Sequence, residues 1–194
     1  YYSSYFAIDI TDPRNPQLLW DKWFPGLGLT INMPTVMSVG RTFNGPTKTW
    51  NNDDSWYLVL GSGYDDFNGW VLDGRKGSLY IVDIKTGELK KQFQTAESCC
   101  YMNTPIAIDK SLNYSVDSIY AAANYWNGVG WFINASNVYR IGIPITNSPY
   151  IEGFEARYNK DPASWTWTKM VAGTGLPIVS APFTISSDKK DNVW

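Results

Sequence analysis

Histidine is absent from this sequence of 194 residues. Its absence excludes serine–histidine–aspartate and cysteine–histidine nucleophiles, imidazole general bases, and every zinc or haem site that needs a histidine ligand. No apolar run approaches the roughly 20 residues of a membrane-spanning helix. With 16 Lys and Arg against 18 Asp and Glu, the chain also lacks a basic field, so we expect no nucleic acid partner.

Aromatic residues, glycine and proline are abundant instead. Aromatics make up 16% of the chain, and 16 glycines and 11 prolines are spread along it. This composition is typical of many short strands joined by turns. The first residues, Tyr1 to Ser4, have neither the charged nor the apolar part of a signal peptide. The sequence therefore reads either as a mature chain or as a piece of a longer protein.

Three short segments resemble one another, and each opens on a proline. They begin around Pro34, Pro105 and Pro182, at intervals of 71 and 77 residues. Proline suits the first residue of a strand because it fixes φ and has no N–H to give to the sheet. The recurrence predicts an internal repeat whose units each begin with such a strand.

Further strands follow each proline segment in the same order. Second strands are expected at 55–63, 117–123 and 191–194, third strands at 5–10, 77–83 and 137–143, and fourth strands at 18–24, 88–93 and 164–171. Four antiparallel strands per unit predict an all-β fold of propeller blades. The expected units are a partial blade over 1–24, blades over 33–93 and 103–171, and a partial blade over 180–194. A β-sandwich is the alternative, but it does not require this repeated order.

Two features resemble a known family. The hairpin over 77–89, in which Asp83 starts the turn and Thr86-Gly87 closes it, is similar to the hairpins of quinoprotein-like propellers. The order of the segments 6–13, 59–64 and 117–121 resembles the C-terminal propeller of PilY1-type proteins, which are adhesins and assembly factors of type IV pili. The resemblance covers nearly the whole chain.

The resemblance implies a role as well as a fold. We expect a bacterial protein that is exported to the cell surface and the pilus tip, without enzymatic activity, and that supports pilus extension and adhesion. Pilins or minor pilins and a host or abiotic surface are the expected partners, and calcium is the expected cofactor. The family's glycine-rich turn after the second strand is replaced here by Ala122 to Tyr125 and an insertion through Trp131. A secreted quinoprotein-like dehydrogenase and a protein-binding propeller scaffold are the alternatives.

The segment from residue 109 to residue 117 matches the family's calcium loop. Oxygen-bearing side chains occupy positions 1, 3, 5 and 9, and the main-chain carbonyl of position 7 completes the set: Asp109, Ser111, Asn113, Asp117 and Ser115. Such spacing turns oxygens inward around a hard cation. The loop is not an EF-hand, because Tyr114 and Tyr120 replace the required glycine and glutamate. Because the loop has only two carboxylates, we expect it to bind calcium weakly, with a dissociation constant of about 10⁻⁴ to 10⁻³ M. The alternative is a polar turn in which Asp109 and Asn113 cap the local backbone.

Cys99 and Cys100 are adjacent, so a bridge between them would be strained. Three interpretations stay open: a vicinal disulfide, pairing with cysteines elsewhere, or two free thiols. If the protein is exported, it meets an oxidising compartment, which favours oxidised cysteines.

The remaining candidates for binding residues are a group of aromatic side chains and two acidic clusters. A group of aromatics is expected to pack between blades rather than to contact a surface or a sugar: Trp126, Trp131, Phe132, Trp165 and Trp167. The acidic clusters over 51–54 and 64–69 are interpreted as solvated turns.

Overall fold

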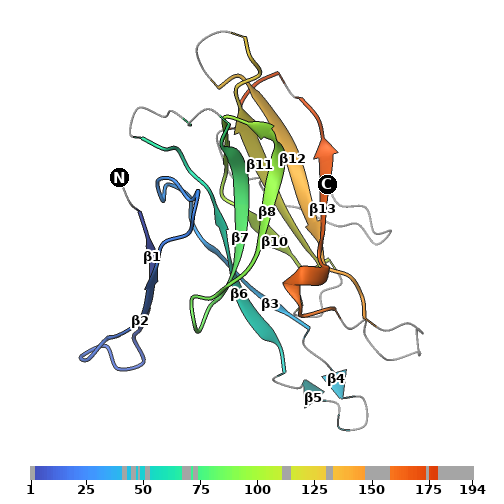
Figure 1. Cartoon of the computed structure of the whole chain (residues 1–194). Helices are drawn as coiled ribbons and strands as arrows, with labels where there is room; N and C mark the ends of the chain where they lie inside the picture. The colour runs from blue at the N-terminus through green and yellow to red at the C-terminus, as the bar shows by residue number, and fades with distance from the viewer. Residues whose placement is uncertain are drawn as a thin grey trace.

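The structure is a computed structural model that describes residues 3–40, 43–44, 47, 49–50, 53–66, 71, 74–110, 115–129, 133–146, 158–173 and 175–178. In these residues every regular element is a strand except one short 3₁₀ turn, η1 (Pro162–Ser164). Two larger sheets stand beside each other, and a separate hairpin lies near the N-terminus (Figure 1). The expected all-β class is confirmed.

The first sheet has four strands whose spatial order is their chain order. Its strands are β3 (Thr35–Val39), β6 (Ser55–Gly61), β7 (Lys76–Asp83) and β8 (Leu89–Ser98). All neighbouring strands are antiparallel. This up-and-down arrangement of four strands is that of a propeller blade. The strand β8 extends beyond residue 93, the expected end of this unit.

The second sheet repeats this order. Its main path is β10 (Ile106–Ile108), β11 (Ser118–Tyr125), β12 (Ala135–Gly142) and β13 (Thr166–Val171), and β9 (Cys100–Met102) also pairs with β11. The two pieces β9 and β10 together form one interrupted inner strand, because Pro105 between them has no N–H to give to β11. The sequence predicted the strand after Pro105 but not the strand before it.

The remaining strands form two small hairpins. The strands β1 (Tyr5–Asp9) and β2 (Gln17–Lys22) pair with each other, and β4 (Phe43–Asn44) pairs with β5 (Thr49–Trp50). Trp20 links the β1–β2 hairpin to the first sheet, because its indole N–H donates a hydrogen bond of 2.9 Å to the carbonyl of Ile84. The expected partial blade over 180–194 lies outside the described residues.

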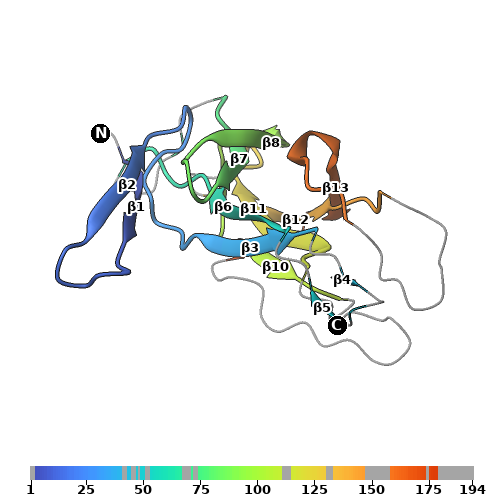
Figure 2. The same cartoon turned by 90° about the horizontal axis from the view of Figure 1, so that it is seen from below.

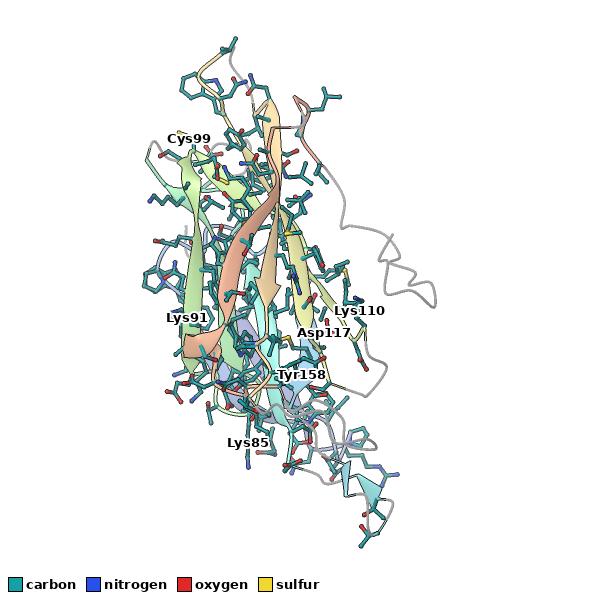
Figure 3. The ribbon with its side chains drawn as sticks, turned by 90° about the vertical axis from the view of Figure 1, so that its right-hand side faces the viewer. Lys85, Lys91, Cys99, Lys110, Asp117 and Tyr158 are labelled. Atoms are coloured by element: carbon teal, nitrogen blue, oxygen red, sulfur yellow. The ribbon has the colours of Figure 1, made fainter. Side chains whose placement is uncertain are left out.

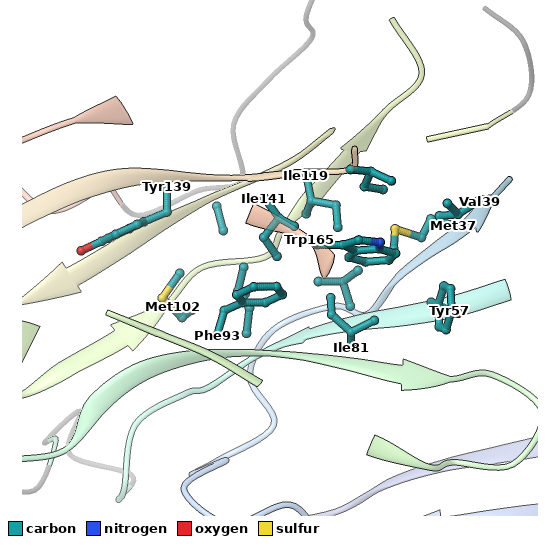
Figure 4. Close-up of a cluster of buried hydrophobic side chains, with 14 of the residues drawn as sticks. Met37, Val39, Tyr57, Ile81, Phe93, Met102, Ile119, Tyr139, Ile141 and Trp165 are labelled. Atoms are coloured by element: carbon teal, nitrogen blue, oxygen red, sulfur yellow. The ribbon is translucent and has the colours of Figure 1, made fainter. Parts of the chain in front are cut away.

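Both faces of the first sheet are buried. Along β7, Tyr80 and Val82 pack against the β1–β2 hairpin, whereas Leu79 and Ile81 pack against the second sheet. These four side chains have no exposed surface. The period-two pattern of a strand explains how one strand serves two cores. Figure 4 shows side chains from both sheets meeting in the larger core, and each fully buried one contributes about 1.5–3 kcal/mol.

The hairpin and the two sheets follow one another in chain order (Figure 2). The sheets described do not close into a ring, which is the arrangement of a partial propeller. Within the described part of the chain, no helix has the length and apolar character that crossing a membrane requires.

Candidate functional site

The expected calcium loop joins β10 to β11, and the structure describes its two ends. The Asp117 carboxylate turns back across the loop, where Oδ2 accepts a hydrogen bond of 2.8 Å from the main-chain N–H of Lys110. The Asp117 N–H donates to the carbonyl of Ile108 at 2.9 Å. The residue after Asp109 and the last residue of the loop therefore lie together (Figure 3). Ser111 and Asn113 lie outside the described residues.

Ser115 ties the end of the loop to the first sheet. Its side chain is fully buried, and its hydroxyl oxygen accepts a hydrogen bond of 2.8 Å from the N–H of Gly40. The next residue, Val116, donates its N–H to the carbonyl of Ser38 at 2.9 Å. The calcium prediction uses the carbonyl of Ser115 and not this hydroxyl. The loop is thus positioned where the inner strands of the two sheets meet.

The donor chemistry of the loop fits a hard cation. The carboxylates of Asp109 and Asp117 and the carbonyl of Ser115 are oxygen donors, and calcium takes six to eight such ligands. In the described residues, no group of three or more Cys, Asp and Glu side chains is arranged to hold a metal ion. A site here would therefore depend on the neutral oxygens of the loop. Calcium binding stays a prediction.

The two cysteines are not joined to each other in the structure, and their surroundings differ. Cys99, at the bend between β8 and β9, has a φ of 50°, and it is the only non-glycine residue with a positive φ in the described chain. Cys100 is fully buried, and burial raises the pKa of its thiol to about 11. A Cβ on Gly77 would lie 2.7 Å from the Cys100 sulfur, so this packing requires a glycine. Oxidation of the pair stays a prediction.

Trp165 and Trp167 pack between the sheets, as expected. Trp165 is 4% exposed and meets the ring of Tyr57 edge to face, with 5.6 Å between the ring centroids. Trp167 stacks on Tyr139 at 4.5 Å and on Phe93 at 5.6 Å. Because Phe93 belongs to the first sheet and Tyr139 to the second, Trp167 joins them. Trp126 differs, since its side chain is 42% exposed. Trp131 and Phe132 lie outside the described residues.

A charged cluster, which no local sequence pattern indicates, accompanies these rings. Glu97 on β8 accepts hydrogen bonds of 2.5 Å from the Tyr139 hydroxyl and from the Lys169 ammonium. Burial raises the pKa of Glu97, but these two hydrogen bonds, a main-chain hydrogen bond and the charge of Lys169 together lower it by more, so the pKa lies below its ordinary value. Burial and the bond to Glu97 raise the pKa of Tyr139. We call Phe93, Glu97, Tyr139, Trp167 and Lys169 the outer seam.

One of the acidic clusters differs from its interpretation as a solvated turn. Asp65 forms an ion pair of 2.8 Å with Arg75, and their side chains are only 18% and 12% exposed. Arg75 also donates to the carbonyls of Gly26 and Gly63. The carboxylate therefore helps to fix the turn after β6. Asp53, from the other cluster, lies 3.4 Å from the ammonium of Lys160, and its side chain is 44% exposed.

Curated relatives share part of their sequence with this chain. The type IV pilus biogenesis factor PilY1 of Pseudomonas aeruginosa strain PAO1 is 28% identical over 127 residues, which is 62% of this chain and 10% of that protein. A PilY1 homolog of Xylella fastidiosa strain Temecula1 is 36% identical over 124 residues, which is 64% of this chain and 8% of that protein. The chain thus spans about a tenth of the length of these relatives. No protein-family model matches it.

The solved structures give the fold. The crystal structure of the Pseudomonas aeruginosa PilY1 C-terminal domain matches with a TM-score of 0.66 and 22% sequence identity, over 98% of this chain and 36% of that chain. The repeated sheets and this match define the chain as part of a β-propeller of four-stranded blades. The chain is therefore similar to PilY1 proteins in part of its sequence and to a PilY1 C-terminal domain in its fold, which agrees with the predicted resemblance.

Proposed function

We propose that this chain is part of the propeller of a type IV pilus biogenesis factor at the bacterial cell surface. The observation that carries the proposal is the agreement of two matches, one in sequence to PilY1 proteins and one in fold to a PilY1 C-terminal domain. The proposed partners are pilins or minor pilins, and the proposed role includes pilus extension at the pilus tip and contact with host or abiotic surfaces.

We propose further that the role is not enzymatic. Two side chains with reactive groups have structural contacts in the core. Glu97 accepts hydrogen bonds from Tyr139 and Lys169, and the Cys100 thiol is buried against Gly77. A scaffold of this kind presents its connecting loops to other molecules. The exposed side chains of Trp126 and Val129, 42% and 69% exposed, lie in such a loop between β11 and β12.

Complementation tests the pilus role. We expect that a strain lacking the gene for this protein has fewer surface pili and does not twitch, and that the wild-type gene restores both. A second complementation uses the full gene from which only the codons for these 194 residues have been deleted. It should fail although the shortened protein reaches the cell surface, as immunoblotting of the surface fraction would show. A null strain with normal piliation and twitching would contradict the proposal.

Activity measurements test the alternative of a dehydrogenase. The purified protein, supplied with pyrroloquinoline quinone, calcium, an alcohol and an electron-accepting dye, should not reduce the dye above the rate without protein. Turnover that saturates with alcohol would show that the protein is an enzyme.

We also propose that calcium binds in the loop between β10 and β11 through Asp109, Ser111, Asn113, Asp117 and the carbonyl of Ser115. The cation would neutralise two carboxylates at the junction of the two inner strands and so stabilise the folded chain by mass action. This proposal can fail while the pilus role stands.

Thermal unfolding in increasing calcium tests the site. The melting temperature of the wild type should rise as calcium reaches the millimolar range, and Asp117→Asn should abolish the rise. Asp12→Asn is the matched control, because Asp12 also accepts a main-chain N–H in a turn, from Arg14 at 3.0 Å, but lies outside the loop. An unchanged melting temperature of the wild type would rule out the site.

A further inference from the structure

An Asn-x-Pro sequence stands at the same point of the inner strand in both sheets. Asn32 precedes Pro34 and Asn103 precedes Pro105. In the first sheet, Thr35 after the proline pairs with Val59, and in the second, Ile106 pairs with Tyr120. The two asparagines are therefore structurally equivalent. Each lies where proline interrupts the main-chain hydrogen bonds of the inner strand.

Asn32 holds the main chain of the next repeat. Its side-chain amide nitrogen donates to the carbonyl of Met102 at 2.6 Å, and the N–H of Met102 donates to the carbonyl of Ser62 at 2.8 Å. Both main-chain groups of Met102 thus bind to the first sheet. Met102 lies three residues before Pro105 and is the last residue of β9, the first piece of the inner strand of the second sheet.

The second sheet holds Ile178 in a similar way. The Asn103 amide donates to the carbonyl of Ile178, which also accepts from the Asn124 amide at 2.9 Å. The side-chain oxygen of Asn124 accepts from the N–H of Ile178 at 2.8 Å. Ile178 lies four residues before Pro182, and Met102 lies three residues before Pro105, so the two bound residues stand at nearly the same distance ahead of a proline. One asparagine of the Asn-x-Pro sequence binds the entrance of the next repeat in each case.

The second sheet uses a second amide, that of Asn124, where the first sheet has a glycine. Its position in the second sheet corresponds to Gly63 in the first, where the chain lies so close that a Cβ would stand 2.0 Å from the carbonyl oxygen of Leu29. In the second sheet the Asn124 carboxamide offers one acceptor and one donor, as a peptide group does. Asn124 is fully buried, and it also donates to Asn103 at 3.0 Å.

We propose that Asn32, Asn103 and Asn124 form an inter-repeat latch, a binding surface for the extended main chain that enters the following repeat. The bound groups are main-chain N–H and C=O, so the latch recognises an extended strand and not its side chains. It fixes where each repeat starts relative to the one before it. In the third copy Ser180 stands at the position of the asparagine, and in the described residues the latch occurs twice, at Asn32 and at Asn103 with Asn124.

Hydrogen exchange tests the latch in the full chain. Asn32→Ser removes an amide that reaches the next repeat, and protection of the Met102 N–H should fall by about three- to tenfold. Asn124→Ser should lower protection of the Ile178 N–H by at least as much, because it removes the acceptor itself. Asn134→Ser is the matched control, since the Asn134 amide also donates to a main-chain carbonyl, that of Val129 at 2.5 Å, within a single loop.

The outcomes separate a latch from a general contribution to stability. The latch predicts that each variant changes exchange at its own partner first, at Met102 for Asn32→Ser and at Ile178 for Asn124→Ser, and that Asn134→Ser changes neither. Unchanged protection at Met102 in Asn32→Ser would overturn the proposal, as would an equal loss of protection in all strands. If Asn124→Ser does not fold, the half-buried Asn32 variant still decides the question.

Discussion

The strands β1 and β7 have equivalent places in their repeats but very different burial. Asp9 and Asp83 end the two strands, and each accepts hydrogen bonds from a threonine in the following turn, Thr11 or Thr86. A shift in pairing register also falls at the same point, after Ala7 in β1 and after Ile81 in β7. The two hairpins are therefore copies of one local structure.

Their side chains nevertheless meet different surroundings. Tyr80 and Val82 of β7 have no exposed surface, whereas Phe6 and Ile8 at the equivalent positions of β1 are 63% and 45% exposed. The β1–β2 hairpin covers the first pair, and no described residues cover the second pair to that extent. The period-two geometry of a strand fixes which face a side chain occupies, but the neighbouring sheet decides whether that face is buried.

The largest predicted effect contrasts Tyr80 with Phe6. Tyr80→Ala should lower the free energy of unfolding by about 3–5 kcal/mol, because it leaves a cavity between the hairpin and the first sheet and removes the hydrogen bond from its hydroxyl to Pro25. Phe6→Ala, at the equivalent exposed position, should change it by less than about 0.5 kcal/mol. Urea denaturation of the two variants measures both values. Equal losses would refute the comparison.

The outer seam should depend on Trp167. Trp167→Ala removes the ring that stacks on both Phe93 and Tyr139 and the indole bond to the carbonyl of Gln94, so we expect a loss of about 2–3 kcal/mol. The matched control is Trp126→Ala in the exposed loop, with an expected loss below about 1 kcal/mol. Denaturation curves compare the two. A smaller loss for Trp167 than for Trp126 would mean that the seam contributes little.

Acid should weaken the same seam through Glu97. Because its pKa is lowered in the folded protein, Glu97 stabilises the fold above its ordinary pKa of 4.5, and this contribution is lost as the pH falls through the lower folded value. Glu97→Gln should cost about 1–2 kcal/mol at pH 7 and make stability less sensitive to pH below 4.5. Melting temperatures from pH 7 to pH 3 test this. Parallel pH profiles for the two proteins would contradict it.

The smallest effect concerns the rates at which the two thiols react. Burial raises the pKa of Cys100 to about 11, so the thiolate is scarce at pH 8 and the sulfur is inaccessible. In the reduced, folded protein, iodoacetamide should modify Cys99 before Cys100, and peptide mass analysis over time would show the order. Faster modification of Cys100 would mean that the bend between β8 and β9 opens readily.

The strands were predictable because their signals are local. Prolines at the inner strands, the Asp-to-Thr turn after β7 and the apolar runs of β6 and β7 placed the strands of both sheets, except β9. The outer seam was not predictable, because Glu97 and Lys169 are 72 residues apart and their pairing depends on how two sheets stack. The Asn-x-Pro pattern also occurs at Asn44 and Asn147, so the sequence alone did not single out Asn32 and Asn103 or their bonding partners.

The sequence by itself determined the repeat, the four strands of each unit and the absence of histidine chemistry, because each depends on composition or on residues close along the chain. Only the tertiary structure decided which faces are buried and which polar groups meet. Leu79 and Ile81 of β7 are fully buried because the second sheet faces them, and Glu97 of β8 meets Lys169 of β13 across the two sheets. The physical reason is that burial and hydrogen bonding between repeats depend on the facing sheet, and a strand's own sequence does not specify that sheet.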